Sequence, residues 1–293
     1  MAKSNQIDSV LAKETDGTIQ ITFRIPFISI KEGKEEALKE LAKDIQIPGF
    51  RKGNAPINKA REHVSEARLI EKTLAKILPK ALGEAIEKFK IKPLIYPKFE
   101  LVSAKENEDW QVRAITCEFP KVDLGDYQKV LTNLIKTSSI WTPAKAKNET
   151  PKEKSKEEKE QAVIQLLLAS AKVDIPKPLV DEEVDARLSG LLERTERLGL
   201  SLEKYLASVG KTPESLRAEY ETQAKEALKL DLILSKIAEQ KATKIADKEV
   251  DDAIRESAGD EKTFEKLNTP EQRRMVEAVL KKRSALDSLT SLV

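Results

Sequence analysis

The chain has 293 residues, 40% of them apolar and 35% charged, and 52 basic side chains nearly balance 50 acidic ones for a net charge of +2. This length suits two domains, and the balanced charge excludes a protein that coats nucleic acid along its whole length. With one cysteine, Cys117, and one histidine, His63, the chain can form neither an internal disulfide nor a zinc site or catalytic dyad that needs two histidines. This shortage of cysteine and histidine favours a binding protein without a cofactor over an enzyme.

The sequence also predicts a cytoplasmic protein without a membrane partner. Residues 1–6 contain no apolar signal core, and the most apolar stretch, 162–171, is too short to cross a bilayer.

Residues 7–27 alternate apolar and polar side chains around the turn dipeptide Asp16-Gly17, which predicts an antiparallel strand pair. A capping-box spacing that begins at Ser29 predicts the start of a helix, which would end at Pro48-Gly49. A second helical pattern over 67–89 contains Pro79, where we expect a kink or a break.

Two further alternating runs, 99–104 and 111–119, predict strands that complete the sheet. We expect Trp110 to pack at the start of one strand and Cys117 to be a buried, inert thiol. Residues 1–135 are therefore predicted to form an α+β domain with an antiparallel sheet and a helix-loop-helix, followed by an extended connector.

The composition changes after this region. Residues 136–160 are rich in Lys and Glu, include Pro143 and Pro151, and read as a linker. Residues 161–293 show helical periodicity throughout, with caps predicted at Thr212-Pro213 and Thr269-Pro270, and so predict an all-α domain.

One loop stands out between the first two predicted helices. Glycine and proline constrain such loops, so the side chains at the tip project outward. Residues 45–61 hold four basic side chains and no acidic one, so this loop could dock on phosphate. An exposed Phe beside Arg and Lys suits an RNA–protein surface, whereas composition alone favours a plain turn whose Phe folds back into the core. The candidate residues are Gly49, Phe50, Arg51, Lys52, Gly53 and Pro56.

The stretch 49–56, Gly-Phe-Arg-Lys-Gly-Asn-Ala-Pro, resembles the ribosome-binding signature of trigger factor, Gly-Phe-Arg-x-Gly-x-x-Pro, at the tip of a helix-loop-helix. Asn54 stands where a lysine is often found. The resemblance covers the helix over 67–89 and the segment 118–122, and resumes at 173–180, which looks like the start of the family's arm-bearing helical domain. The family's FKBP-type prolyl isomerase domain, of about a hundred residues, would lie between these portions, where this chain has only the charged linker.

The resemblance implies an ATP-independent holdase, without enzyme activity, that docks on ribosomal protein and RNA near the nascent-chain exit site and shields apolar segments of new proteins. No Gly-x-x-x-x-Gly-Lys-Ser/Thr loop for a nucleotide phosphate occurs in the sequence. Two alternatives stay open: a ribosome-docking assembly or stress factor that holds no client, and a prolyl isomerase. Whether two copies form a homodimer is also open.

Overall fold

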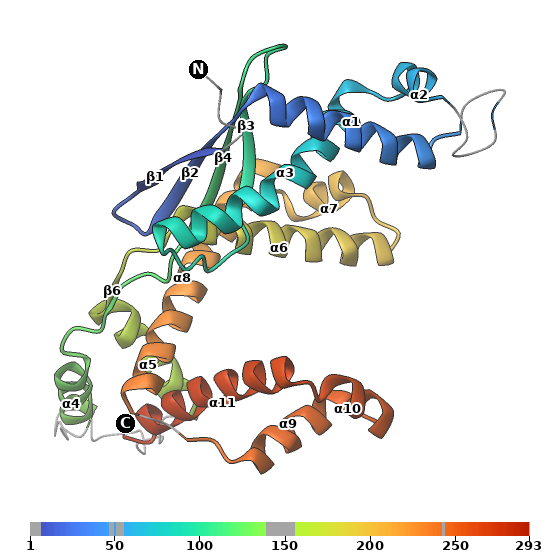
Figure 1. Cartoon of the computed structure of the whole chain (residues 1–293). Helices are drawn as coiled ribbons and strands as arrows, with labels where there is room; N and C mark the ends of the chain where they lie inside the picture. The colour runs from blue at the N-terminus through green and yellow to red at the C-terminus, as the bar shows by residue number, and fades with distance from the viewer. Residues whose placement is uncertain (1–6, 47–49, 51–55, 139–155, 242–243, 293) are drawn as a thin grey trace. The chain divides into compact units, whose positions relative to one another are not determined.

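The computed structural model describes residues 7–46, 50, 56–138, 156–241 and 244–292 (Figure 1). The chain divides into two compact units. The first unit comprises Met1–Phe119 and Pro176–Leu179, and the second comprises Pro120–Ile175 and Val180–Val293. The predicted domain boundaries at 135/136 and 160/161 stay predictions.

The first unit is built on an antiparallel sheet in the order β1-β2-β4-β3. The predicted hairpin is confirmed, with Asp8 opposite Arg24 and Lys13 opposite Ile19. At its turn Gly17 has a φ of 94°, a left-handed conformation that glycine adopts without strain. Both later strands are confirmed as well. The strands are β1 (Asp8–Lys13), β2 (Thr18–Ile25), β3 (Lys98–Ser103) and β4 (Trp110–Cys117).

Helices α1 (Phe27–Asp44), α2 (Ile57–His63) and α3 (Glu66–Phe89) complete the first unit. Side chains of the sheet and of α3 share one core, which includes Phe23, Leu78 and the predicted buried Trp110. Cys117 is fully buried at the end of β4, as expected. The short helix α2 was not predicted.

Helix α1 begins two residues before the predicted capping box, because its first turn is capped from elsewhere in the chain. The N–H of Phe27 donates to Oδ1 of Asp109 at 3.0 Å, and the N-cap residue Pro26 contributes no side-chain cap. This carboxylate satisfies an amide that would otherwise lack a partner in the first turn. The helix ends at Asp44, earlier than predicted, and Pro48-Gly49 lies outside the described residues.

Helix α3 is continuous across Pro79, so of the two expected outcomes, a kink or a break, the break does not occur. Proline removes one backbone hydrogen bond, but the same two turns bury Leu78, Ala81 and Leu82. Burial of this apolar face outweighs the local cost.

Among its described residues, the regular structure of the second unit is helical except for one short strand pair. Val122–Asp123 (β5) pairs antiparallel with Lys172–Val173 (β6), so the region predicted as all-α contains two strand residues. The helices are α4 (Tyr127–Ser138), α5 (Lys156–Ser170), α6 (Lys177–Arg197), α7 (Leu202–Val209), α8 (Pro213–Gln240), α9 (Asp247–Ala258), α10 (Glu261–Leu267) and α11 (Pro270–Thr290).

The main core of the second unit joins segments that are far apart in sequence. Leu131 of α4, Leu167 of α5 and Ile237 of α8 are buried in one cluster that also takes in α11. Helix α4 runs into the start of the predicted 136–160 linker and α5 begins inside its end, because both helices bury apolar residues in this cluster. Residues 139–155 of the linker lie outside the described residues.

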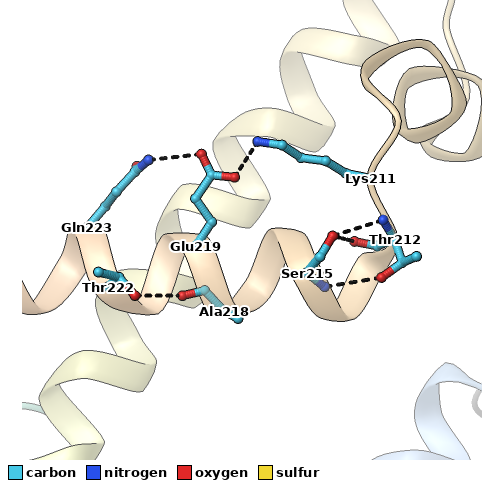
Figure 2. A network of polar contacts seen from close by, with 7 residues as sticks. All are labelled: Lys211, Thr212, Ser215, Ala218, Glu219, Thr222 and Gln223. Carbon is cyan, nitrogen blue, oxygen red and sulfur yellow. Dashed lines mark hydrogen bonds and ion pairs between the residues drawn. The ribbon is translucent and has the colours of Figure 1, made fainter.

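The predicted caps of α8 and α11 are present. Thr212 and Ser215 form a reciprocal capping box at the start of α8, with Ser215 N–H donating to Thr212 Oγ1 at 3.2 Å (Figure 2). One turn further on, Glu219 accepts from both Lys211 and Gln223, which ties the preceding loop to the helix (Figure 2). At α11, Thr269 Oγ1 accepts from Gln272 N–H at 3.2 Å.

Two helical hairpins in the second unit have small cores of their own and match the predicted helical arms. The first is formed by α6, α7 and the start of α8 around Leu191, Leu206 and Leu216. The second is formed by α9, α10 and α11 around Val250, Ile254 and Phe264, and Figure 1 shows α9 alongside α11 with the short α10 between them in the chain.

Candidate functional site

The predicted docking loop joins α1 to α2. Phe50 is 42% exposed, so it does not fold back into the core as the plain-turn alternative required. Pro56 is exposed and is the N-cap residue of α2, with a φ of −57°. The four other candidates lie outside the described residues: Gly49, Arg51, Lys52 and Gly53.

Small apolar residues hold the base of this loop. Ala42 near the end of α1 and Ala60 in α2 are buried against each other, with Ile45 packed beside them. Alanine side chains let two helix backbones approach closely. The two ends of the loop are therefore fixed by a contact that the sequence pattern did not indicate.

Helix α1 is in turn fixed on α3 through Gly33. A Cβ atom at Gly33 would lie 2.9 Å from Ile77 Cδ1 and 3.1 Å from Thr73 Cγ2. Next to this contact, Lys76 of α3 donates to Glu40 of α1 at 2.7 Å. The hydrogen bond from Lys76 lowers the pKa of the Glu40 carboxyl, and the same bond raises the pKa of Lys76.

The basic character of the loop region is weaker than its sequence suggests. Lys59 of α2 pairs with Glu62 at 3.0 Å, one residue beyond the acid-free stretch 45–61. Arg61 is exposed, and within the described part of the chain no salt bridge joins it to a carboxylate. The net positive field of the loop therefore rests on Arg61 together with Arg51 and Lys52.

The hairpins of the second unit carry exposed apolar side chains that the sequence alone did not single out. At the α6–α7 connection Leu198 is 75% exposed, and the nearby Leu200 is also exposed. On α11, Met275 and Val279 are 65% and 59% exposed and lie on one face because they are four residues apart. Periodicity could not separate these residues from core positions, since both kinds follow the same helical spacing.

The first unit also has exposed apolar residues outside the loop. Tyr96 is 73% exposed and Phe119 is 56% exposed, and Leu94 lies on the same chain segment as Tyr96. These residues are a second surface that could contact apolar segments.

The described residues form neither a membrane-spanning helix nor a cluster of metal ligands. No helix within the described ranges is long and apolar enough to cross a membrane. The described residues also contain no group of three or more His, Cys, Asp and Glu side chains that could hold a metal ion.

The fold therefore defines a chain of two parts: an α+β unit that presents a loop between two helices, and a helical unit with two hairpins. Two family models match these parts, the "Bacterial trigger factor protein (TF)" model over residues 9–149 and its "C-terminus" model over residues 144–291. The chain belongs to the bacterial trigger factor family. Because the two matches overlap, no residues are left between them for the isomerase domain that the resemblance placed there.

Curated relatives agree with this assignment. The chain is 35% identical over 108 residues to trigger factors of Streptococcus agalactiae serotype Ia and of Limosilactobacillus reuteri, which is 37% of this chain and 25% of each relative. It is 32% identical over 145 residues to trigger factor of Pediococcus pentosaceus, which is 50% of this chain and 32% of that protein. The matched part thus spans about a quarter to a third of the length of these relatives.

One solved structure has the same fold. It is described as "Promiscuous Substrate Recognition in Folding and Assembly Activities of the Trigger Factor Chaperone" and superposes with a TM-score of 0.58. The superposition covers 97% of this chain and 99% of that chain at 13% sequence identity. At this identity the likeness shows the fold alone.

Proposed function

We propose that this protein is an ATP-independent chaperone that docks on the ribosome near the nascent-chain exit site and shields apolar segments of newly made proteins. The observation that carries the docking step is the exposed Phe50 in the loop between α1 and α2. An exposed aromatic ring flanked in sequence by Arg51 and Lys52 provides one apolar anchor and two charged groups for ribosomal protein and RNA.

The exposed apolar residues of the two hairpins support the holding step. Leu198, Leu200, Met275 and Val279 are aliphatic or thioether side chains, which accept varied apolar partners without demanding one geometry. Each contact removes a modest area from water at roughly 25 cal/mol per Å², so capture is reversible without ATP.

The proposal includes no enzyme activity, a cytoplasmic location, and no membrane partner. The two matched family portions leave no room between them for an isomerase domain, which supports the absence of that activity. Self-association into a homodimer is compatible with the exposed apolar residues but is not needed for either step.

Ribosome cosedimentation of the full chain tests the docking step. We expect Phe50→Ala, Arg51→Ala and Lys52→Ala together to abolish binding, because charged hydrogen bonds contribute roughly 1.5 to 3 kcal/mol each before screening. The matched control changes one exposed aromatic and two exposed lysines of the same unit, Tyr96→Ala, Lys92→Ala and Lys98→Ala. Retention of the loop variant on ribosomes at moderate salt would exclude this loop as the docking site.

The two alternatives make different predictions. An assembly or stress factor would bind ribosomes through the same loop but would not suppress aggregation of a chemically unfolded protein. A prolyl isomerase would accelerate a proline-limited refolding reaction, which we expect this chain not to do. Measurement of both activities on one preparation separates the three functions.

A further inference from the structure

A cavity of about 330 Å³ lies within the first unit. It is bounded by the first turns of α1, by Arg61 of α2, by Leu69 of α3, and by residues 105–107 between β3 and β4. Its size is at the low end for ligand pockets, so it suits one or two side chains better than a large cofactor.

The floor of this cavity is apolar and buried. Ile30 is 1% exposed, Leu38 is 7% exposed and Trp110 is 2% exposed, and all three line the cavity. Phe27 of α1, whose backbone N–H is held by Asp109, lies at the same wall. Such a floor is formed before any ligand arrives, which lowers the ordering cost of binding.

The rim of the cavity is basic. Four cationic side chains line it, Lys31, Lys34, Arg61 and Lys105, against two acidic ones, Glu35 and Glu106. The ammonium group of Lys34 lies 4.9 Å from the centre of the Trp110 ring. Lys105 pairs with Glu108 at 3.7 Å, but across the described ranges no salt bridge engages Lys31, Lys34 or Arg61.

We propose that this cavity binds an acidic peptide segment that carries one apolar side chain. The apolar side chain enters against Phe27 and Leu69, which are half-buried, and carboxylates on either side of it pair with Lys31, Lys34 and Arg61. Removal of the apolar group from water gives the affinity, and the rim selects for negative charge. This site goes beyond ribosome docking and does not depend on it.

A peptide fits this cavity better than RNA does. Trp110 is almost fully buried and its ring is covered by Lys34, so it offers no open face on which a base could stack. A sugar–phosphate backbone would use only the rim and would leave the apolar floor unfilled. A peptide with both kinds of side chain uses both parts of the cavity.

The test measures binding of a labelled synthetic peptide to the full chain by fluorescence anisotropy. The probe has a phenylalanine between two pairs of glutamates. Two analogues replace the glutamates with glutamine or the phenylalanine with alanine, and a short oligouridylate serves as the RNA probe. We expect the parent peptide to bind, both analogues to bind about tenfold more weakly, and added salt to weaken the binding.

Charge reversal at the rim provides the protein-side test. Lys31→Glu with Arg61→Glu should weaken binding of the parent peptide about tenfold, because two exposed attractions become repulsions. The control with equal charge change is Lys39→Glu with Arg68→Glu, exposed positions on α1 and α3 that do not line the cavity. The loop variant with alanine at 50–52 should bind the peptide normally, which separates this proposal from the docking proposal.

Three results would overturn the proposal. They are no binding of the parent peptide at concentrations up to about 1 mM, equal binding by the rim variant and its control, or tighter binding of the oligouridylate that is lost in the rim variant. The last result would assign the rim to nucleic-acid phosphate.

Discussion

Lys13 at the end of β1 and Glu118 just after β4 form a salt bridge of 2.8 Å that joins residues at opposite ends of the first unit's sequence. The other oxygen of Glu118 accepts from the backbone N–H of Lys92 at 3.2 Å. One carboxylate therefore fixes the hairpin, the end of β4 and the segment after α3. The hydrogen bond from Lys13 is the main reason that the pKa of Glu118 lies below its usual value of 4.5.

The contribution of Glu118 to the stability of the first unit should be complete above about pH 4.5 and should decrease as the pH falls below that value. A carboxyl with a lowered folded-state pKa contributes stability above its unfolded pKa and loses it as the pH falls through the folded value. We expect Glu118→Gln to lower the free energy of unfolding by about 0.5 kcal/mol at pH 7, since the pair is partly exposed. Urea denaturation at pH 7 and at about pH 3 should show a smaller difference in acid. Glu84→Gln, an exposed position on α3, is the control, and a deficit of the same size in acid would contradict the assignment.

Gly33 should tolerate no large side chain. The nearest atoms to an added Cβ are side-chain methyl groups of Ile77 and Thr73, so Gly33→Leu should overpack the contact of α1 with α3. We expect a loss of about 1 to 3 kcal/mol in the free energy of unfolding.

Gly83 in α3 is the matched control because nothing lies within 4 Å of its added Cβ. Gly83→Ala should stabilise the protein by about 0.5 to 1 kcal/mol through helix propensity. Equal behaviour of large residues at both positions in thermal denaturation would be inconsistent with this packing.

Holding activity should depend on the apolar residues of the hairpins. We expect Leu198→Ser with Leu200→Ser, and separately Met275→Ser with Val279→Ser, to reduce suppression of aggregation of a chemically unfolded protein about twofold or more. All four side chains are exposed, so their substitution should leave unfolding unchanged.

The comparison variant carries Leu94→Ser and Tyr96→Ser in the first unit. Light scattering during dilution from denaturant measures all three variants under one condition. A loss of protection in this comparison variant alone would move the holding surface to the α+β unit and contradict the expectation.

Arg273 should stabilise the second hairpin. Its guanidinium donates a hydrogen bond to Oδ1 of Asn268 at 2.9 Å and forms a salt bridge with Asp251 of α9. One side chain of α11 therefore joins this helix to α9 and to the connection between α10 and α11. We expect Arg273→Ala to lower the free energy of unfolding by about 1 kcal/mol and to speed hydrogen exchange in α9. The neighbouring Arg274 is exposed, and Arg274→Ala is the control. Unchanged exchange in α9 would show that the apolar contacts around Phe264 suffice.

Local patterns in the sequence determined much of the fold. The alternation around Asp16-Gly17 predicted the hairpin, and Thr212-Pro213 predicted the start of α8, because turns and caps depend on residues that are close together in the chain. The loop that contains Phe50 was found in the same way, from glycine, proline and basic residues within one short stretch.

Tertiary structure decided what depends on residues far apart. Asp109 caps α1 from a different part of the chain, and burial of Leu78 and its neighbours keeps α3 continuous through Pro79. The cavity above Trp110 and the exposure of Leu198 were likewise invisible in the sequence, since helical spacing is the same for a buried leucine and an exposed one. Only packing against other segments determines which apolar side chains are left in contact with water.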